Sequence, residues 1–190
     1  MNFNKTSLPG VLLIEPKVFS DSRGFFMETF QRRLYKEAGI DYEFVQDNLS
    51  YSKKGTLRGL HYQYPNSQGK LVSVVYGEVF DVTVDIRKGS PTFGNWYGIE
   101  ISAENKRHLW IPPGVAHGFY VTAEAAVFVY KCTDYYNQQT EHTILWNDDA
   151  LSIQWPVSEH IVSAKDTNGT LLSKIPEQNL PKYQPSLITY

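Results

Sequence analysis

Two segments of this chain alternate their residue types with a period of two, which is the spacing of side chains on a β-strand. In the first segment, one strand face carries apolar residues and the other polar ones, with Phe80, Val82, Val84 and Ile86 opposite Asp81, Thr83 and Asp85. The second segment places Ala126, Phe128 and Tyr130 on one face, so the Tyr130 ring should point into a sheet interior. The pattern predicts a chain built mainly from β-strands.

Turn-forming residues separate the predicted strands at residues 21–24, 65–69, 88–94 and 112–114. Many short strands at such spacing are typical of an antiparallel sandwich or barrel. The 13 Tyr, 10 Phe and 4 Trp also favour sheet over helix, since they stand against only 8 Ala. One short helix is expected, because Phe30, Leu34, Tyr35 and Ala38 follow a helical spacing and Gly39 stands at the position of a C-terminal cap.

Length and charge bound the class of protein. With 190 residues, 42% of them hydrophobic, the chain is expected to form one globular domain over residues 1–190, with a C-terminal arm over about residues 170–190. A net charge of −2 argues against a surface that coats nucleic acid or an anionic membrane. Cys132 is the single cysteine, the first residues lack the apolar core of a signal peptide, and no apolar stretch approaches the roughly 20 residues of a membrane span. A cytoplasmic protein is therefore expected.

The segment LeuArgGlyLeuHisTyrGln, residues 57–63, places a cation, a glycine and an imidazole in one predicted strand. A lone buried histidine is more often a hydrogen-bonded core residue than a functional one, but the proximity of Arg58, Gln63 and Lys70 favours a site. Strict alternation would put Arg58 and His61 on opposite faces. A shared site therefore requires a β-bulge, for which Gly59 is suited.

The histidines argue against a metal centre. They stand singly, at positions 61, 108, 117, 142 and 160, without the His-x-His pair through which small barrels often hold a transition metal. His117, close to a Pro-Pro-Gly turn, could be a loop residue, a metal ligand or a substrate donor, and the spacing of the histidines helps to decide among these roles. No nucleotide-binding loop or nucleophile-elbow motif is present either. Chemistry by His, Tyr and Lys without a metal or cofactor points to proton transfer.

Eight segments of the chain, taken together and in order, resemble the dTDP-4-dehydrorhamnose 3,5-epimerases, a family of the cupin superfamily. They are residues 21–28, 44–48, 57–63, 69–72, 77–87, 111–119, 130–136 and 163–166. The resemblance extends over roughly residues 5 to 170. It implies a mainly β fold, a jelly-roll (cupin) double-stranded β-helix barrel with one or few short helices. It also implies a homodimer to which about residues 1–30 contribute, and no metal or other cofactor.

The resemblance also implies a reaction, the inversion of dTDP-4-dehydro-6-deoxy-D-glucose at C3 and C5 to dTDP-4-dehydro-L-rhamnose. His61 would be the base, oriented by Asp166, and Tyr130 would deliver a proton from the opposite face of the sugar. Lys70 would stabilise the enolate oxygen. The positions that match substrate contacts are Arg23, Phe26, Glu28, Gln46, Asn48, Arg58, His117, Tyr136, Glu141 and Lys165. Of these, Arg23, Arg58 and Lys165 would meet the diphosphate, and Tyr136 would stack on the thymine.

Three other interpretations compete with this one. The first is a relative that epimerises only C3 or only C5. The presence of His61, Lys70 and Tyr130 favours the full reaction, but the choice between one and two inversions lies in the shape of the pocket. A metal-dependent cupin oxygenase or isomerase is disfavoured by the missing His-x-His pair. A sugar-nucleotide binding module would keep the arginines and Tyr136, but it would not need His61 and Tyr130 together.

Overall fold

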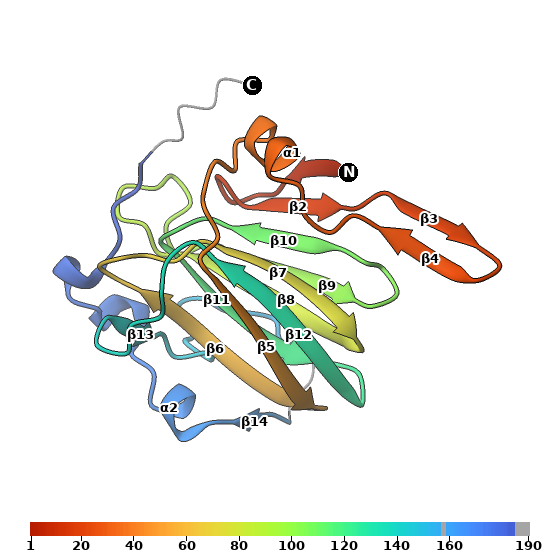
Figure 1. The fold of residues 1–190 in the computed structure, drawn as a ribbon. Helices are drawn as coiled ribbons and strands as arrows, with labels where there is room; N and C mark the ends of the chain where they lie inside the picture. Colours follow the sequence, from red (N-terminus) through yellow and green to blue (C-terminus); the bar gives the residue numbers. More distant parts are fainter. Residues whose placement is uncertain (157–158, 185–190) are drawn as a thin grey trace.

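A computed structural model describes residues 1–156 and 159–184 of the chain as a barrel of two antiparallel sheets (Figure 1). The first sheet has the order β1 (Asn2–Lys5), β2 (Leu12–Glu15), β10 (His108–Ile111), β7 (Lys70–Tyr76), β12 (Ala125–Cys132) and β5 (Gln46–Lys53). The second has the order β13 (Glu141–Thr143), β6 (Thr56–Gln63), β11 (Val115–Val121), β8 (Glu78–Asp85) and β9 (Trp96–Ser102). The short strand β14 (Ile161–Val162) pairs in parallel with β6.

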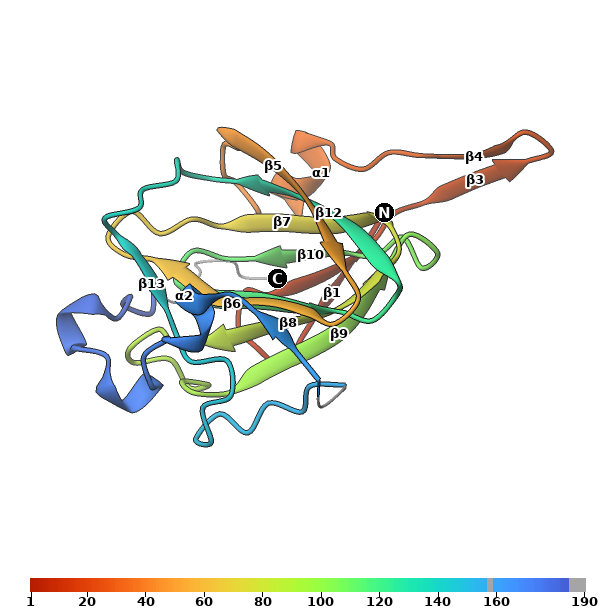
Figure 2. The same cartoon turned by 90° about the horizontal axis from the view of Figure 1, so that it is seen from below.

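The chain passes from one sheet to the other at almost every turn between β5 and β12. Only the step from β8 to β9 stays within a sheet. Gly77 alone connects β7 to β8, with a φ of +75°, and a Cβ there would lie 1.9 Å from the carbonyl oxygen of Ala125. Only glycine fits such a turn. This winding is the jelly-roll barrel that the resemblance implied, and Figure 2 shows the two sheets facing each other.

The alternating segments fold as predicted. Val79 of β8 and Phe128 of β12 belong to one apolar cluster between the sheets, against which Tyr130 packs. The opposite face of β8 also lies in an apolar cluster, formed by Val82, Val84 and Ile86 with residues of the C-terminal part of the chain. Both faces of β8 are therefore buried, and its polar residues Asp81, Thr83 and Asp85 point inward.

The predicted helix is α1, Arg32–Glu37, and Gly39 follows its end with a φ of +87°. It packs Tyr35 onto the outer side of the first sheet, against a cluster with Ile14 and Trp110. The predicted turn at residues 21–24 joins β3 (Val18–Asp21) and β4 (Gly24–Met27), a hairpin that projects away from the barrel (Figure 1). No described helix is long and apolar enough to cross a bilayer.

The C-terminal part contains the helix α2 (Ala164–Thr167) and the 3₁₀ turns η1 (Leu172–Lys174) and η2 (Glu177–Asn179). Leu172 is buried in the cluster behind β8. The Lys88 N–H donates to the Pro181 carbonyl at 2.7 Å, so the segment lies against the barrel as far as residue 184. The rest of the arm expected from about residue 170, residues 185–190, lies outside the described residues.

Candidate active site

A β-bulge in β6 brings His61 and Arg58 to the same face of the sheet. His61 pairs with His117 on β11, and Arg58 pairs with Phe119, so two residues of β6, Gly59 and Leu60, lie opposite the single residue Gly118 of β11. Gly59 lies in the bulge with a φ of +127°, and a Cβ there would come within 2.5 Å of the Gly118 Cα. The bulge predicted from the sequence is thus confirmed.

His61 forms a hydrogen-bonded pair with Asp166. Their Nε2 and Oδ1 atoms are 2.6 Å apart, the Asp166 side chain is 4% exposed, and that of His61 is 27% exposed. Burial raises the pKa of Asp166. The interaction with His61, together with weaker hydrogen bonds from Ser163 and Gly59, lowers it by more than burial raises it, so the net pKa is below the ordinary value. Because a carboxylate only accepts hydrogen bonds, Nε2 carries a proton in this pair, and in the neutral imidazole Nδ1 is then the atom with the free lone pair. This is the arrangement of a general base with an orienting carboxylate.

Helix α2 holds Asp166 in place. The Ser163 hydroxyl oxygen caps the helix by accepting from the Asp166 N–H at 3.1 Å. Strand β14, which directly precedes α2, pairs with β6 and so brings this segment alongside the strand that carries His61. A cap and a strand pairing therefore unite two residues that are 105 positions apart.

Tyr130 and Lys70 lie in the first sheet, across the barrel from His61. Cys132 is the register partner of Lys70 and shares a strand face with Tyr130. Burial raises the pKa of Tyr130, and Coulomb interactions with Cys132 and Glu141 add to this. Burial lowers the pKa of Lys70, although nearby acidic groups partly restore it. A phenol with a raised pKa is protonated at neutral pH and can serve as an acid.

A chain of hydrogen bonds runs along one edge of this site. Lys165 Nζ lies 2.6 Å from Glu141 Oε1, and the Tyr136 hydroxyl donates to Glu141 Oε2 at 2.9 Å. The Tyr136 N–H donates to Gln46 Oε1 at 2.9 Å, and Gln46 in turn donates to Asn48 at 3.0 Å. The Tyr136 ring itself is 53% exposed and free to receive a flat partner. Five of the expected substrate contacts thus form one network.

Arg58 links the two sheets, because its Nε on β6 donates to the Ser52 hydroxyl on β5 at 3.0 Å. Its charge also acts on the Tyr130 hydroxyl and lowers the pKa of that group, against the larger effect of burial. Arg58 is exposed, so its guanidinium is accessible to an anion.

His117 makes a second histidine–carboxylate pair, with Asp81. Its Nε2 lies 2.8 Å from Asp81 Oδ2, and its ring stacks on Phe128 with centroids 5.9 Å apart. The sequence reasoning included His117 but missed Asp81, which it assigned only to the polar face of a strand. The strand register was the missing information: Thr83 pairs with His117, and Asp81, two residues from Thr83 on the same face, pairs with Phe119.

The structure does not bring Arg23, Phe26 and Glu28 to the site. Arg23 and Phe26 belong to the projecting hairpin, where Arg23 pairs with Asp21 at 2.6 Å and its side chain is 88% exposed. Phe26 is 69% exposed, and Glu28 is exposed just after β4. Within a single chain these three residues are therefore remote from His61.

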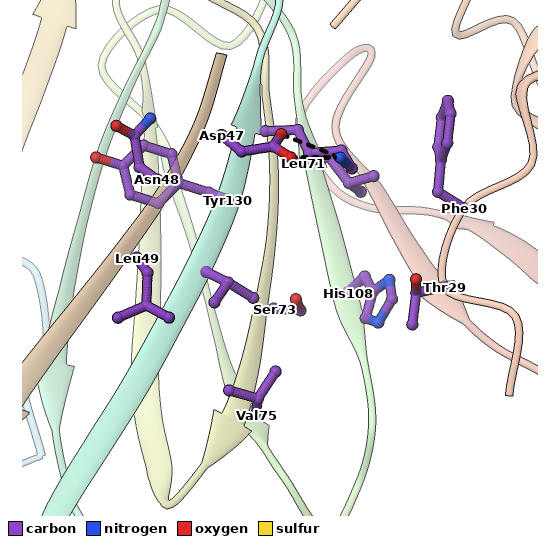
Figure 3. Close-up of a pocket in the computed structure, with 12 residues that line it drawn as sticks. Thr29, Phe30, Asp47, Asn48, Leu49, Leu71, Ser73, Val75, His108 and Tyr130 are labelled. Carbon is purple, nitrogen blue, oxygen red and sulfur yellow. Dashed lines mark hydrogen bonds and ion pairs between the residues drawn. The ribbon is translucent and has the colours of Figure 1, made fainter. Parts of the chain in front are cut away.

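A pocket of about 430 Å³ lies on the outer face of the first sheet, where Leu49, Leu71 and Val75 are among the residues that line it (Figure 3). It is mostly apolar, with an ion pair of Lys131 and Asp47 at 3.0 Å along one side. Only Tyr130 and Asn48 line this pocket and also belong to the set of expected site residues. His61, Lys70 and Asp166 are not among the residues that line this pocket.

Known proteins resemble this chain over nearly its whole length. A family model described as dTDP-4-dehydrorhamnose 3,5-epimerase matches residues 5–174. The dTDP-4-dehydrorhamnose 3,5-epimerase of Shigella flexneri is 59% identical over 171 residues, which cover 89% of this chain and 94% of the relative. The crystal structure of dTDP-6-deoxy-D-glucose-3,5-epimerase from Legionella pneumophila Philadelphia 1, in complex with dTDP-4-keto-L-rhamnose, is 55% identical with a TM-score of 0.94, covering 96% of this chain and 98% of that one.

A 3'-monoepimerase from Streptomyces bikiniensis, solved in complex with dTDP-quinovose, is also similar. It is 35% identical with a TM-score of 0.89, and the match covers 95% of this chain and 93% of that one. Enzymes described as double and as single epimerases thus share this fold, so the fold by itself does not distinguish the two activities. The family model and the closely similar relatives decide the membership: the chain belongs to the dTDP-4-dehydrorhamnose 3,5-epimerase family.

Proposed function

We propose that this protein is an isomerase that converts dTDP-4-dehydro-6-deoxy-D-glucose to dTDP-4-dehydro-L-rhamnose in dTDP-L-rhamnose biosynthesis, by inverting C3 and C5. One observation carries the proposal. A histidine–carboxylate base, His61 with Asp166, and a protonated phenol, Tyr130, come from the two facing sheets of one barrel. A sugar ring held between the sheets would present one face to each.

The substrate's ketone makes both carbons acidic. C3 and C5 are each bonded to the C4 carbonyl carbon, so removal of either proton leaves an electron pair that moves onto the C4 oxygen as an enolate. His61 would take the proton at Nδ1, and the Asp166 carboxylate would stabilise the imidazolium that forms. The Lys70 ammonium would stabilise the enolate oxygen. Acid–base and charge effects of this kind each contribute on the order of 10² to 10⁴ in rate.

Inversion requires that the proton return on the other face of the ring. Tyr130 would give its hydroxyl proton to the carbon as the C4 carbonyl re-forms. The imidazolium then releases its proton to solvent, and the phenolate regains one. Each inversion therefore exchanges one carbon-bound hydrogen with solvent, and no metal or redox cofactor takes part in these steps.

The nucleotide end of the substrate fits the edge network. Stacking of thymine on the exposed Tyr136 ring is worth roughly 1–3 kcal/mol. Arg58 and Lys165 are the basic groups of this chain that we assign to the diphosphate, with His117, Gln46, Asn48 and Glu141 as further contacts. Arg23, Phe26 and Glu28 complete the set only if a second chain supplies them.

We propose a homodimer for this reason. The outer face of the first sheet leaves Leu49, Tyr51, Val75 and Tyr76 each more than half exposed, an apolar area typical of an interface. The projecting β3–β4 hairpin exposes Phe19, Phe25 and Phe26. A partner covering that sheet face would give both exposed apolar surfaces a contact. It would also let the hairpin deliver Arg23 to the partner's site.

The test is to incubate dTDP-4-dehydro-6-deoxy-D-glucose with the enzyme in D₂O and to follow C3 and C5 by NMR. Deuterium at both carbons with inversion supports the proposal. Absence of exchange contradicts it and favours a sugar-nucleotide binding module. Activity that requires one equivalent of bound transition metal would contradict the metal-free mechanism. We further propose a cytoplasmic location, where nucleotide sugars are made, which fractionation of cells would test.

The second candidate function is a mono-epimerase. It is favoured by the similarity to the 3'-monoepimerase from Streptomyces bikiniensis. The same NMR experiment separates the two candidates, because a mono-epimerase would place the label on a single carbon.

A further inference from the structure

Two buried aspartates on the inward face of β8 differ in how fully their carboxylate oxygens are hydrogen-bonded. Asp81 and Asp85 are both fully buried. Asp85 accepts hydrogen bonds on both oxygens, from Arg87 at 2.8 Å and from the hydroxyls of Ser90 and Thr92 at 2.5 and 2.6 Å. Asp81 uses Oδ2 for His117, but its Oδ1 has no hydrogen-bond partner among the described residues. Asp85 is thus held as a structural carboxylate, and Asp81 is not.

A buried carboxylate oxygen without a partner is costly, by about 1–3 kcal/mol or more for a charged group, so a fold retains one where it serves another purpose. Asp81 is placed for such a purpose. It faces the interior between the sheets beside His117, and its negative charge acts on Lys70. Within the described part of the chain, the Lys70 ammonium group has no ion pair or side-chain hydrogen bond, although burial disfavours its charge.

We propose that Asp81 is a positioning residue of the epimerase site: its carboxylate orients the His117 imidazole through Oδ2 and holds the Lys70 side chain in its charged form across the barrel. This inference rests on the proposed function, because it assigns Asp81 a task in that reaction. Asp81 touches neither the reacting carbons nor the enolate oxygen. It acts through the two residues that do contact substrate.

The charges around Lys70 show why Asp81 matters. Cys132 on the adjacent strand, Glu141 on β13 and Asp81 on β8 each raise the pKa of Lys70, while Lys165 on α2 lowers it. Burial raises the pKa of the Cys132 thiol, so that group is neutral at pH 7. Glu141 is already engaged by Lys165 and Tyr136. Of these acidic groups, Asp81 is the carboxylate with an oxygen, Oδ1, that accepts no hydrogen bond from the described residues.

The experiment is the pH profile of kcat for Asp81→Asn. The amide oxygen can still accept from His117, but the negative charge is lost, so Lys70 should lose its proton at a lower pH. The alkaline limb of kcat should then move toward neutral pH by about 1 unit or more. Thr83→Val is the matched control. It alters a buried residue on the same inward face without changing charge, and its alkaline limb should coincide with that of the wild type.

A folded Asp81→Asn enzyme whose alkaline limb coincides with the wild type overturns the inference and leaves the proposed function standing. A wild-type protein that does not epimerise overturns the proposed function and this role together. If Asp81→Asn does not fold, long-range ¹H–¹⁵N NMR of the wild type decides, with His117 assigned by comparison with His117→Gln. A proton on His117 Nε2 at pH 7.5 supports the inference, and a ring protonated only at Nδ1 overturns it.

Discussion

Replacement of Asp166 by asparagine tests the base directly. The change keeps the size of the side chain and its place in α2 but removes the negative charge that lies 2.6 Å from His61 Nε2. Because this pair is mostly buried, the lost interaction is a charge-assisted hydrogen bond worth about 1.5–3 kcal/mol. If the imidazolium forms only in the transition state, the loss appears in kcat, as a decrease of about 10- to 160-fold.

The assay follows deuterium entry at C3 and C5 in D₂O under saturating substrate. Since both inversions use the same base, exchange should slow at both carbons, and KM should change little. Asp149→Asn is the control, because Asp149 is an exposed carboxylate and its substitution makes the same chemical change on the surface. A folded Asp166→Asn enzyme with a kcat within threefold of the wild type would refute the reasoning. Equal losses in the Asp149→Asn control would refute it as well.

Three further predictions follow from the same structure. Tyr130→Phe should lower product formation by about 10²- to 10⁴-fold while solvent exchange continues, and an equal loss in both would contradict the assigned acid. Val75→Asp should give a monomer in sedimentation velocity, whereas Ile161→Asp, also at an exposed apolar side chain, should not change the assembly; a dimeric Val75→Asp protein would contradict the proposed interface. Burial raises the pKa of Asp166 and Glu141, but hydrogen bonds from His61 to Asp166 and from Lys165 and Tyr136 to Glu141 hold both net values below the ordinary ones. Their stabilisation is therefore present above about pH 4 and is lost as the pH falls through the lowered values, so the free energy of unfolding in urea should fall below about pH 4, and a flat profile would contradict this.

Local pattern predicted much of this fold. The period of two identified β8 and β12, because successive side chains of a strand point to opposite faces. The apolar spacing before Gly39 identified α1. Even the bulge at Gly59 followed from local reasoning, since a shared site for Arg58 and His61 required one. Such features depend on neighbours within a few residues, and these are visible in the sequence itself.

Other parts depend on pairings between distant segments. The contact of Asp81 with His117 depends on the register of β8 and β11, because the same polar residue on a strand is equally compatible with a solvated face. The place of Asn48 next to Tyr130 likewise follows from a pairing between β5 and β12. Arg23 shows a different limit, since its hairpin projects away from the barrel that carries His61. The role that we propose for Arg23 depends on a second molecule.

The polar groups of the site interrupt the apolar interior at neighbouring positions of several strands. On β12, Phe128 belongs to the inner cluster, and Tyr130, two residues on, faces the site; on β11, Phe119 and His117 are related in the same way. Phe128 stacks on Phe119 at 4.3 Å and on His117 at 5.9 Å between ring centroids. The aromatic residues of the apolar cluster therefore pack against the polar site residues and support them. Truncation of Phe128 to alanine would cost about 3–5 kcal/mol of stability and would remove the ring on which the His117 imidazole stacks, so stability and the packing of His117 are coupled through one side chain.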